Sequence, residues 1–374
     1  MPPIPDIRLP ADLRPADGRF GSGPSKVRAE ALEALVASAP TYLGTSHRQE
    51  GVRSVVRRLR SGLAELFSLP DGYEVVLGNG GAAFFWDIAS FWLIERRSQH
   101  LVFGQFSSTF SKVVAAAPHL EAPEVVEAPY GTRPEVRPSA DVDLYALCHN
   151  ETSTGVAMDI TRPAGAAGLV AVDATSAAGG MTVGPAQFDA YYFAPQKCFA
   201  SDGGLWVALL SPAALERVAA IEAAGRWSPA ALSLPVAVEQ ARLDQTYNTP
   251  ALATLFLFAD QLEWMLANGG LAWAAGRSAT STGLLYAWAE KCDYASPFVA
   301  RPEDRSPVVA TIDIDGSVDA GVVSAVLRAN GIVDTDSYRG LKRNQLRIAC
   351  YPAVDPADVE VLTGAIDHVV SRLS

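Results

Sequence analysis

The sequence predicts an α/β fold: a large domain with a mainly parallel sheet flanked by helices, and a smaller C-terminal α+β domain. Short, almost continuously apolar segments alternate with helical segments, which is typical of a parallel sheet buried on both faces. The chain has 374 residues, 49% of them hydrophobic, and is long enough for two domains with a large core. We expect an N-terminal arm at residues 1–17, a large domain at 18–267 and a small domain at 268–374.

Helices and strands alternate in the first half of the chain. From Val52 onward, apolar side chains recur at the spacing of one helix face, with arginines mostly opposite, so this helix is the clearest one. A helix is also expected at 26–38, and a strand at 73–77 leads through a Gly-rich turn into a helix that ends near 95. Further strands are expected at 101–104, 124–127, 144–148, 168–172, 190–193 and 205–210.

Helical patterns dominate after residue 212. They cover 213–224, 251–268 and 271–291, with polar loops at 232–235 and 244–250. The C-terminal part is expected to contain strands at 308–314, 333–335 and 345–350, and helices at 318–330 and 356–373.

Active residues of an open parallel sheet gather at the carboxyl ends of its strands. Four candidates follow predicted strands in this way: Phe106, Thr152, Asp173 and Lys197.

Charge and cysteine usage exclude several classes of protein. The net charge of −11 and the lack of a basic tract argue against a nucleic-acid-binding surface. No apolar run reaches the roughly 18 residues of a membrane span, and the first residues lack the pattern of a signal peptide. The four cysteines are scattered without metal-ligand spacing, so we expect no metal site and free thiols in a reducing cytoplasm.

A lysine in apolar surroundings is the first candidate for chemistry. Lys197 lies in an almost uncharged run, and Asp173 closes an apolar strand 24 residues earlier. Desolvation lowers the pKa of an amine, as a nucleophile or proton carrier requires. A pyridoxal phosphate site needs such a lysine for its Schiff base, and an acid that keeps the pyridine nitrogen protonated. The alternative is a lysine that reaches solvent and an aspartate that caps a helix.

The Gly-rich turn Gly78–Phe84 lies between a strand and a helix. Small residues there let backbone N–H groups approach an anion that the helix dipole favours, so a phosphate is the expected ligand. The turn also matches the dinucleotide fingerprint GxGxxA. However, the next strand lacks the acidic residue that would hold a ribose, so this interpretation is weaker.

Arg347 lies within an apolar strand, where a guanidinium needs a partner or a bound anion. It could hold a carboxylate through two parallel hydrogen bonds, and a buried structural ion pair is the alternative. Arg339, Lys342 and Arg343 in the preceding loop form a plausible phosphate neighbourhood. The remaining polar candidates could be plain surface charges or helix caps: His47, Arg48, Thr152, Asn248 and Thr249.

Taken together, the motifs resemble the phosphoserine aminotransferases of the pyridoxal-phosphate fold-type I, class V group, and most resemble the actinobacterial branch. They follow the family's order from about residue 19 to the end of the chain. The segments that carry the resemblance are Arg19–Ser25, Gly44–Arg48, Gly78–Ala83, His149–Thr152, Val172–Ser176, Phe193–Lys197, Tyr247–Pro250 and Leu346–Ile348.

The resemblance implies a role for each candidate. Lys197 would form the Schiff base with pyridoxal 5′-phosphate and shuttle the proton, and Asp173 would pair with the pyridinium nitrogen. The other implied cofactor contacts are Gly81, Ala82, Ala83 and Gln196 at the phosphate, Phe106 on the ring, Thr152 at its edge, and Asn248 and Thr249 from the partner subunit of a homodimer with a shared active site. The implied substrate contacts are Arg347 at the α-carboxylate and His47, Arg48 and Arg339 at the second anionic group.

Two positions depart from the family pattern. Many members have a tryptophan where Phe106 stands, and a phenyl ring stacks with less area. Many also have an arginine at the position of Ala82, so the set of phosphate contacts is less certain here.

The implied activity is reversible amino transfer between L-glutamate and 3-phosphohydroxypyruvate, which gives O-phospho-L-serine and 2-oxoglutarate in serine biosynthesis. A phosphorylated intermediate of vitamin B6 (pyridoxine) biosynthesis is an additional candidate substrate. One rival is a class V lyase such as a cysteine desulfurase, although none of the four cysteines is placed on a suitable mobile loop. The other rivals are an aminotransferase that uses alanine or serine with glyoxylate, and a non-enzymatic phosphate- or nucleotide-binding module.

Overall fold

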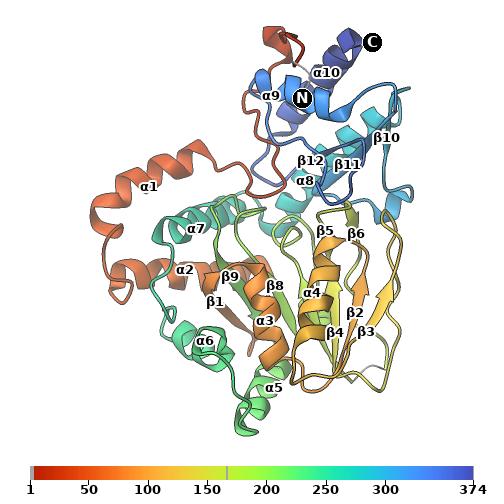
Figure 1. The fold of residues 1–374 in the computed structure, drawn as a ribbon. Coiled ribbons are helices and arrows are strands. Elements are labelled where there is room, and N and C mark those ends of the chain that lie inside the picture. Colours follow the sequence, from red (N-terminus) through yellow and green to blue (C-terminus); the bar gives the residue numbers. More distant parts are fainter. Residues whose placement is uncertain (1–3, 166, 374) are drawn as a thin grey trace.

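A seven-stranded sheet forms the centre of the larger part of the molecule (Figure 1). The structure is a computed structural model and describes residues 4–165 and 167–373. The strand order is β1-β9-β8-β7-β4-β2-β3. The five strands from β8 to β3 are parallel, and β9 runs antiparallel to both β8 and β1, which confirms a mainly parallel sheet. The strands are β1 Glu74–Gly80, β2 Ser98–Val102, β3 Glu124–Glu127, β4 Leu144–Cys148, β7 Leu169–Asp173, β8 Ala190–Phe193 and β9 Gly204–Leu210.

Helices cover both faces of this sheet, as its apolar strands require. Along β7, Val170 and Val172 face one core while Leu169 and Ala171 face the other, because successive side chains of a strand point to opposite faces. The first core is completed by α2 (Glu50–Leu66) and α7 (Leu252–Ala267). The second is completed by α3 (Ala82–Trp92), α4 (Gln105–Ala116), α5 (Pro212–Ala223) and α6 (Leu234–Arg242).

The C-terminal part has its own antiparallel sheet and its own core. The sheet has the order β10-β11-β12, with β10 Ala295–Pro297, β11 Val309–Ile314 and β12 Gln345–Ala349. The helices α8 (Gly270–Ala289), α9 (Ala320–Ala329) and α10 (Pro356–Leu373) pack on it. The division of the chain at residue 268 stays a prediction.

The N-terminal segment lies against the C-terminal part of the chain. The Leu9 N–H donates to Asn330 Oδ1 at 3.0 Å, and Arg19 forms an isolated bridge with Val333. Beyond this segment, α1 (Ala29–Tyr42) leads into α2. The N-terminal segment therefore contacts the C-terminal part of the molecule before the chain enters the central sheet.

Several elements differ from the sequence-based prediction. The expected strand at 333–335 is wrong, because Val333 makes only an isolated bridge and Asp334 has φ +63°, a left-handed conformation that interrupts an extended chain. Part of the expected loop at 232–235 belongs to α6, whose first turn is capped by the Ser233 hydroxyl at 3.4 Å from the Val236 N–H. The first helix begins at Ala29 rather than at residue 26. The short pair β5 (Asn150–Glu151) and β6 (Val156–Ala157) had no sequence signal that we detected.

A buried carboxylate fixes the beginning of α4. Glu151 has no exposed surface and accepts hydrogen bonds from the Ser107 N–H at 2.9 Å, the Ser107 hydroxyl at 2.9 Å and the Ser153 hydroxyl at 2.7 Å. A negative charge is stabilised there by the helix dipole and the free N–H groups. Gly104 leaves room for it, because a Cβ at residue 104 would lie 2.1 Å from Glu151 Cγ. This arrangement sets the position of Phe106, the second residue of α4.

Gly104→Ala is expected to lower the free energy of unfolding by about 1–3 kcal/mol, because the added methyl group overlaps a side chain held by several donors. The matched control is Gly276→Ala in α8, where a Cβ meets nothing within 4 Å. That change should raise the free energy of unfolding by about 0.5–1 kcal/mol through helix propensity. Chemical denaturation of both variants measures the difference, and equal effects would contradict the close contact at Gly104.

Candidate active site

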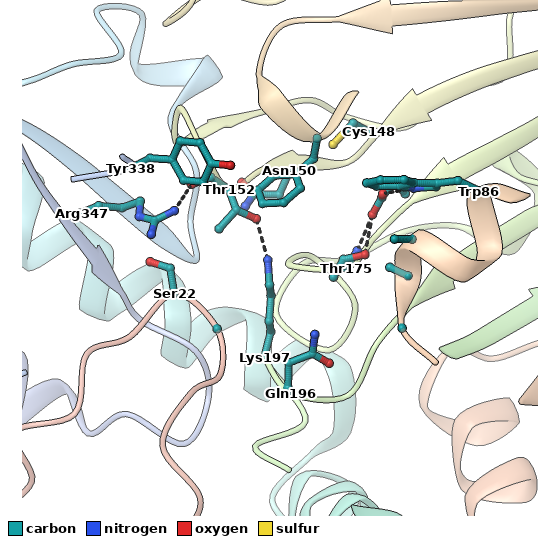
Figure 2. A pocket seen from close by; sticks show the side chains of 16 residues that line it. Ser22, Trp86, Cys148, Asn150, Thr152, Thr175, Gln196, Lys197, Tyr338 and Arg347 are labelled. Carbon is teal, nitrogen blue, oxygen red and sulfur yellow. Dashed lines mark hydrogen bonds between the residues drawn. The ribbon is translucent and has the colours of Figure 1, made fainter. Parts of the chain in front are cut away.

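A cavity of about 370 Å³ opens beside the carboxyl ends of β4 and β7 (Figure 2). Its walls come from distant parts of the chain: the Ser22–Gly23 segment, the first turn of α3, the start of α4, the segment after β8, and β12. The cavity thus lies where active residues are expected in a parallel sheet. Nine of the predicted residues line it: Gly81, Ala82, Ala83, Phe106, Thr152, Asp173, Gln196, Lys197 and Arg347.

Lys197 is buried at the base of the cavity with its amine pointing towards Thr152 (Figure 2). Its Nζ donates to Thr152 Oγ1 at 2.9 Å and lies 5.3 Å from the centre of the Phe106 ring. Burial lowers the pKa of Lys197 from 10.5 to about 8; the negative charge of Asp173 opposes this shift, and the positive charge of Arg347 adds to it. The lysine therefore has the lowered pKa that a nucleophilic amine requires.

The backbone passes close to the Lys197 side chain at residue 23, where only glycine fits. Gly23 has φ +128°, and a Cβ there would lie 2.9 Å from Lys197 Cε. The neighbouring Ser25 hydroxyl donates to the Lys197 carbonyl at 2.6 Å. The N-terminal segment therefore packs tightly along the lysine and limits the conformations of its side chain.

Asp173 ends β7 and accepts three hydrogen bonds from uncharged donors. Its Oδ1 accepts from the Thr175 N–H at 3.0 Å and the Thr175 hydroxyl at 2.6 Å, and its Oδ2 accepts from Trp86 Nε1 at 3.0 Å. Both oxygens of the Asp173 carboxylate are therefore held in a fixed orientation. The position suits an acid that holds a proton on a ring nitrogen.

Arg347 brings a positive charge into the cavity from β12. Its Nη1 donates to the Thr152 carbonyl at 3.3 Å, and its guanidinium carbon lies 5.2 Å from the centre of the Tyr338 ring. Within residues 4–165 and 167–373, no carboxylate lies within ion-pair distance of Arg347, and its Nε is buried without a hydrogen-bond partner. Burial therefore lowers the pKa of Arg347. This arrangement favours a bound anion over a structural ion pair.

The residues of the cavity fit the cofactor that the resemblance implies. The first turn of α3 borders the cavity, and no side chain among the described residues caps it, so the Ala82 and Ala83 N–H groups are available for a phosphate. Gln196 Oε1 and Asn150 Oδ1 are buried and have no hydrogen-bond partner among the residues that the structure describes, which is unusual unless a ligand supplies one. An amine, an acid and an arginine complete the set that pyridoxal 5′-phosphate and an amino-acid substrate would need.

Five predicted residues do not line this cavity. His47, Arg48, Asn248 and Thr249 lie together elsewhere: His47 Nδ1 is 3.1 Å from Thr249 Oγ1, and Arg48 Nη1 donates to Gln245 Oε1 at 2.6 Å. Arg339 is exposed on the loop before β12. The roles predicted for these five residues stay predictions.

Lys342 and Arg343, on the loop before β12, belong to the predicted phosphate neighbourhood. Arg343 is engaged elsewhere, with two hydrogen bonds to Asp313 and its guanidinium over the Phe298 ring. Lys342 is exposed on the same loop. The structure therefore gives Arg343 a structural contact that its sequence position did not reveal.

Several cavity residues were missed in the sequence. Thr175 follows Asp173 at a spacing that commonly bonds an aspartate side chain, so the signal was available. Trp86 and Tyr338 gave no such signal, since one looks like an ordinary core residue of a helix and the other like a loop residue. Ser22, whose hydroxyl is buried without a partner, was read only as part of a turn.

Comparisons with known proteins agree with this geometry. Residues 135–336 match the family model for class-V aminotransferases. The chain is 60% identical over 370 residues to the phosphoserine aminotransferase of Nocardioides sp. (strain ATCC BAA-499 / JS614), covering 98% of this chain and 99% of that protein.

Two solved structures have the same fold. One is a phosphoserine aminotransferase from Cytophaga hutchinsonii ATCC 33406, with a TM-score of 0.85 and 24% identity over 94% of this chain and 99% of that chain. The other is a PLP-bound phosphoserine aminotransferase from Trichomonas vaginalis, with a TM-score of 0.79 and 18% identity over 94% of this chain and 99% of that chain. At these identities the solved structures support the fold alone.

The Lys197 amine of the cofactor-free protein is expected to become reactive with a midpoint near pH 8, because burial favours its neutral form. An unperturbed lysine reaches the same point only at about pH 10.4. Competitive acylation across a pH series, followed by mass spectrometry, measures the midpoint at Lys197. The exposed Lys112 on α4 serves as an internal reference in the same sample, and a shared midpoint for both lysines would show that burial does not tune Lys197.

Proposed function

Because the chain belongs to the class-V aminotransferase family, we propose that it catalyses reversible amino transfer between L-glutamate and 3-phosphohydroxypyruvate, which gives O-phospho-L-serine and 2-oxoglutarate. The observation that carries this proposal is the near full-length identity to a phosphoserine aminotransferase, together with the meeting of Lys197, Asp173 and Arg347 in one cavity. The reaction belongs to serine biosynthesis.

Pyridoxal 5′-phosphate is the cofactor, and when bound it supplies an aldehyde that accepts the amino group and a ring that takes up the electrons of the α-carbon. In our proposal Lys197 Nζ would hold the cofactor when no substrate is bound. With a substrate in the cavity, the same amine would act as the base that takes the proton from the substrate α-carbon and as the acid that donates a proton again. Thr152 Oγ1, at 2.9 Å, holds this amine in place between the two roles.

The other cavity residues would bind and orient. Asp173 would hold a proton on the ring nitrogen, and Phe106, in the first turn of α4, would stack on the ring. The first turn of α3, with Gln196, binds the cofactor phosphate. Arg347 would bind the α-carboxylate of either substrate, since its Nε is buried and unpaired within residues 4–165 and 167–373.

We further propose that the active site is completed by a second copy of the chain. Asn248 and Thr249 are exposed and would reach the cofactor phosphate of the partner subunit. His47 bonds to Thr249, so it would enter the same neighbouring site and there favour the second anionic group of the substrate, together with Arg48. Phe84, at the start of α3, is 47% exposed, as expected for a surface that another chain covers. Arg339 would act from the same chain as Arg347.

The same proposal places the protein in the cytoplasm. All four cysteines are free thiols in the structure, which suits a reducing compartment. Among the helices that the structure describes, none is long and apolar enough to cross a membrane.

The boundaries 18–267 and 268–374 remain our proposal for the two domains.

A cysteine desulfurase needs a reactive thiolate, and the cysteines of this chain are poorly suited to that role. Cys148, which borders the cavity, and Cys198, next to Lys197, are buried, and burial raises the pKa of both thiols. A raised pKa keeps a thiol protonated and unreactive. This observation disfavours the lyase alternative.

A steady-state comparison of amino donors tests the proposed function. With 2-oxoglutarate as acceptor, phosphoserine should have a kcat/KM at least about 100-fold higher than serine or alanine, because the phosphate adds charge-assisted hydrogen bonds. The coupled formation of glutamate measures each rate. Equal kcat/KM values for phosphoserine and serine would refute the substrate assignment, and release of sulfide from cysteine would favour the lyase.

Complementation between two inactive variants tests the shared site. Lys197→Ala removes the amine, and Asn248→Ala combined with Thr249→Ala removes the proposed contacts to the partner. When the two proteins are unfolded and refolded together, hybrid dimers should regain about a quarter of the native activity, because each hybrid contains one unaltered site. Refolding each variant alone is the control. A mixture as inactive as its components would mean that Asn248 and Thr249 act within their own chain.

A further inference from the structure

The indole of Trp86 makes one of the three hydrogen bonds that hold Asp173. Trp86 is 7% exposed and lines the cavity, and its Nε1–H donates to Asp173 Oδ2 at 3.0 Å (Figure 2). Thr175 supplies the other two donors to Oδ1. Both oxygens of the carboxylate are therefore fixed, one from the loop after β7 and the other from α3.

The helix that carries Trp86 also begins at the proposed phosphate site. Residues 81–83 lie at the start of α3, and Trp86 follows one turn later, roughly 5–6 Å along the helix axis. A helix turn is stiff on this length scale. A shift of the first turn of α3 therefore also moves the Trp86 indole and, through its hydrogen bond, the Asp173 carboxylate.

The Trp86 ring is itself held by α4. It stacks on Phe110, with ring centres 6.0 Å apart and planes inclined by 17°. Phe110 lies four residues after Phe106, on the same side of α4. The contact between the two aromatic rings thus couples α3 to the helix that supplies the ring proposed to stack on the cofactor.

We propose that Trp86 is a positioning residue: through α3 it ties the phosphate-binding turn to Asp173 and holds that carboxylate at the ring nitrogen of the cofactor. This inference rests on the proposed function, which assigns Asp173 to the ring nitrogen. Removal of the N–H deletes the hydrogen bond that Trp86 makes to Asp173 Oδ2, which loosens the orientation of the carboxylate.

Trp86→Phe tests the proposal, because it removes the donor and keeps an aromatic ring against Phe110. The dissociation constant of pyridoxal 5′-phosphate should rise about ten-fold, the value of one hydrogen bond to a charged group. The pH midpoint of the bound cofactor's absorbance change should also shift, which a purely structural role would not produce. The other titratable groups around Asp173 are Cys148, Tyr191, Tyr192 and Lys197, and none of them is altered.

Trp92→Phe is the matched control. Trp92 is the last residue of α3 and is 4% exposed, and its buried Nε1 has no hydrogen-bond partner in the described part of the chain. The same atoms are removed from the same helix, so any general effect on α3 appears in both variants. The proposal is overturned if Trp86→Phe and Trp92→Phe give the same cofactor affinity and the same pH midpoint.

Two further measurements separate this proposal from the proposed function. Asp173→Asn should change the cofactor's absorbance more than Trp86→Phe does; if it changes nothing, the assignment of Asp173 itself fails. Indole ¹H–¹⁵N spectra of the tryptophan-labelled protein do not depend on whether Trp86→Phe folds. One indole signal should move when Asp173→Asn is introduced, and seven unmoved signals would overturn the hydrogen bond.

Discussion

The burial of one amine organises the site. Lys197 is desolvated by the strand ends, by the Ser22–Gly23 segment and by the Phe106 ring, and this desolvation is the largest influence on its pKa. Neutral amines are nucleophiles and bases, whereas ammonium ions are neither. The charges of Asp173 and Arg347 have opposite effects on the pKa of the amine, so burial has the largest influence on this pKa.

The short hairpin β5–β6 connects the seven-stranded sheet to the three-stranded sheet. The Thr311 hydroxyl of β11 donates to the Thr154 carbonyl at 3.0 Å, and the Ser306 N–H donates to the Gly155 carbonyl at 2.9 Å. A Cβ at Gly155 would lie 2.5 Å from Thr311 Oγ1, so the turn can approach β11 only as glycine. The residue that bonds Lys197 and the strand that carries Arg347 are thereby held in one structural unit.

Much of this arrangement could be predicted from the sequence, because buried parallel strands give continuous apolar segments and their carboxyl ends indicate the site. Lys197 and Asp173, which line the cavity, were singled out in this way, whereas Thr152 was considered only because of the lysine. The hydrogen bond from Trp86 to Asp173 could not be predicted, since a tryptophan in an apolar helix has the same sequence pattern whether or not its N–H contacts an acid. Arg343 looked equivalent to its basic neighbours until the fold paired it with Asp313.

The cavity wall combines the beginning and the end of the chain, since Gly23 packs on Lys197 while Arg347 enters from β12. During synthesis on the ribosome, the N-terminal segment and the central sheet emerge well before β12 does. Domains that fold as they emerge can complete only those contacts whose partners already exist. In a nascent chain, Lys197 and Asp173 can therefore lie at their strand ends before Arg347 exists, and the cavity is closed only when β12 and the late residues that hold the N-terminal segment have emerged.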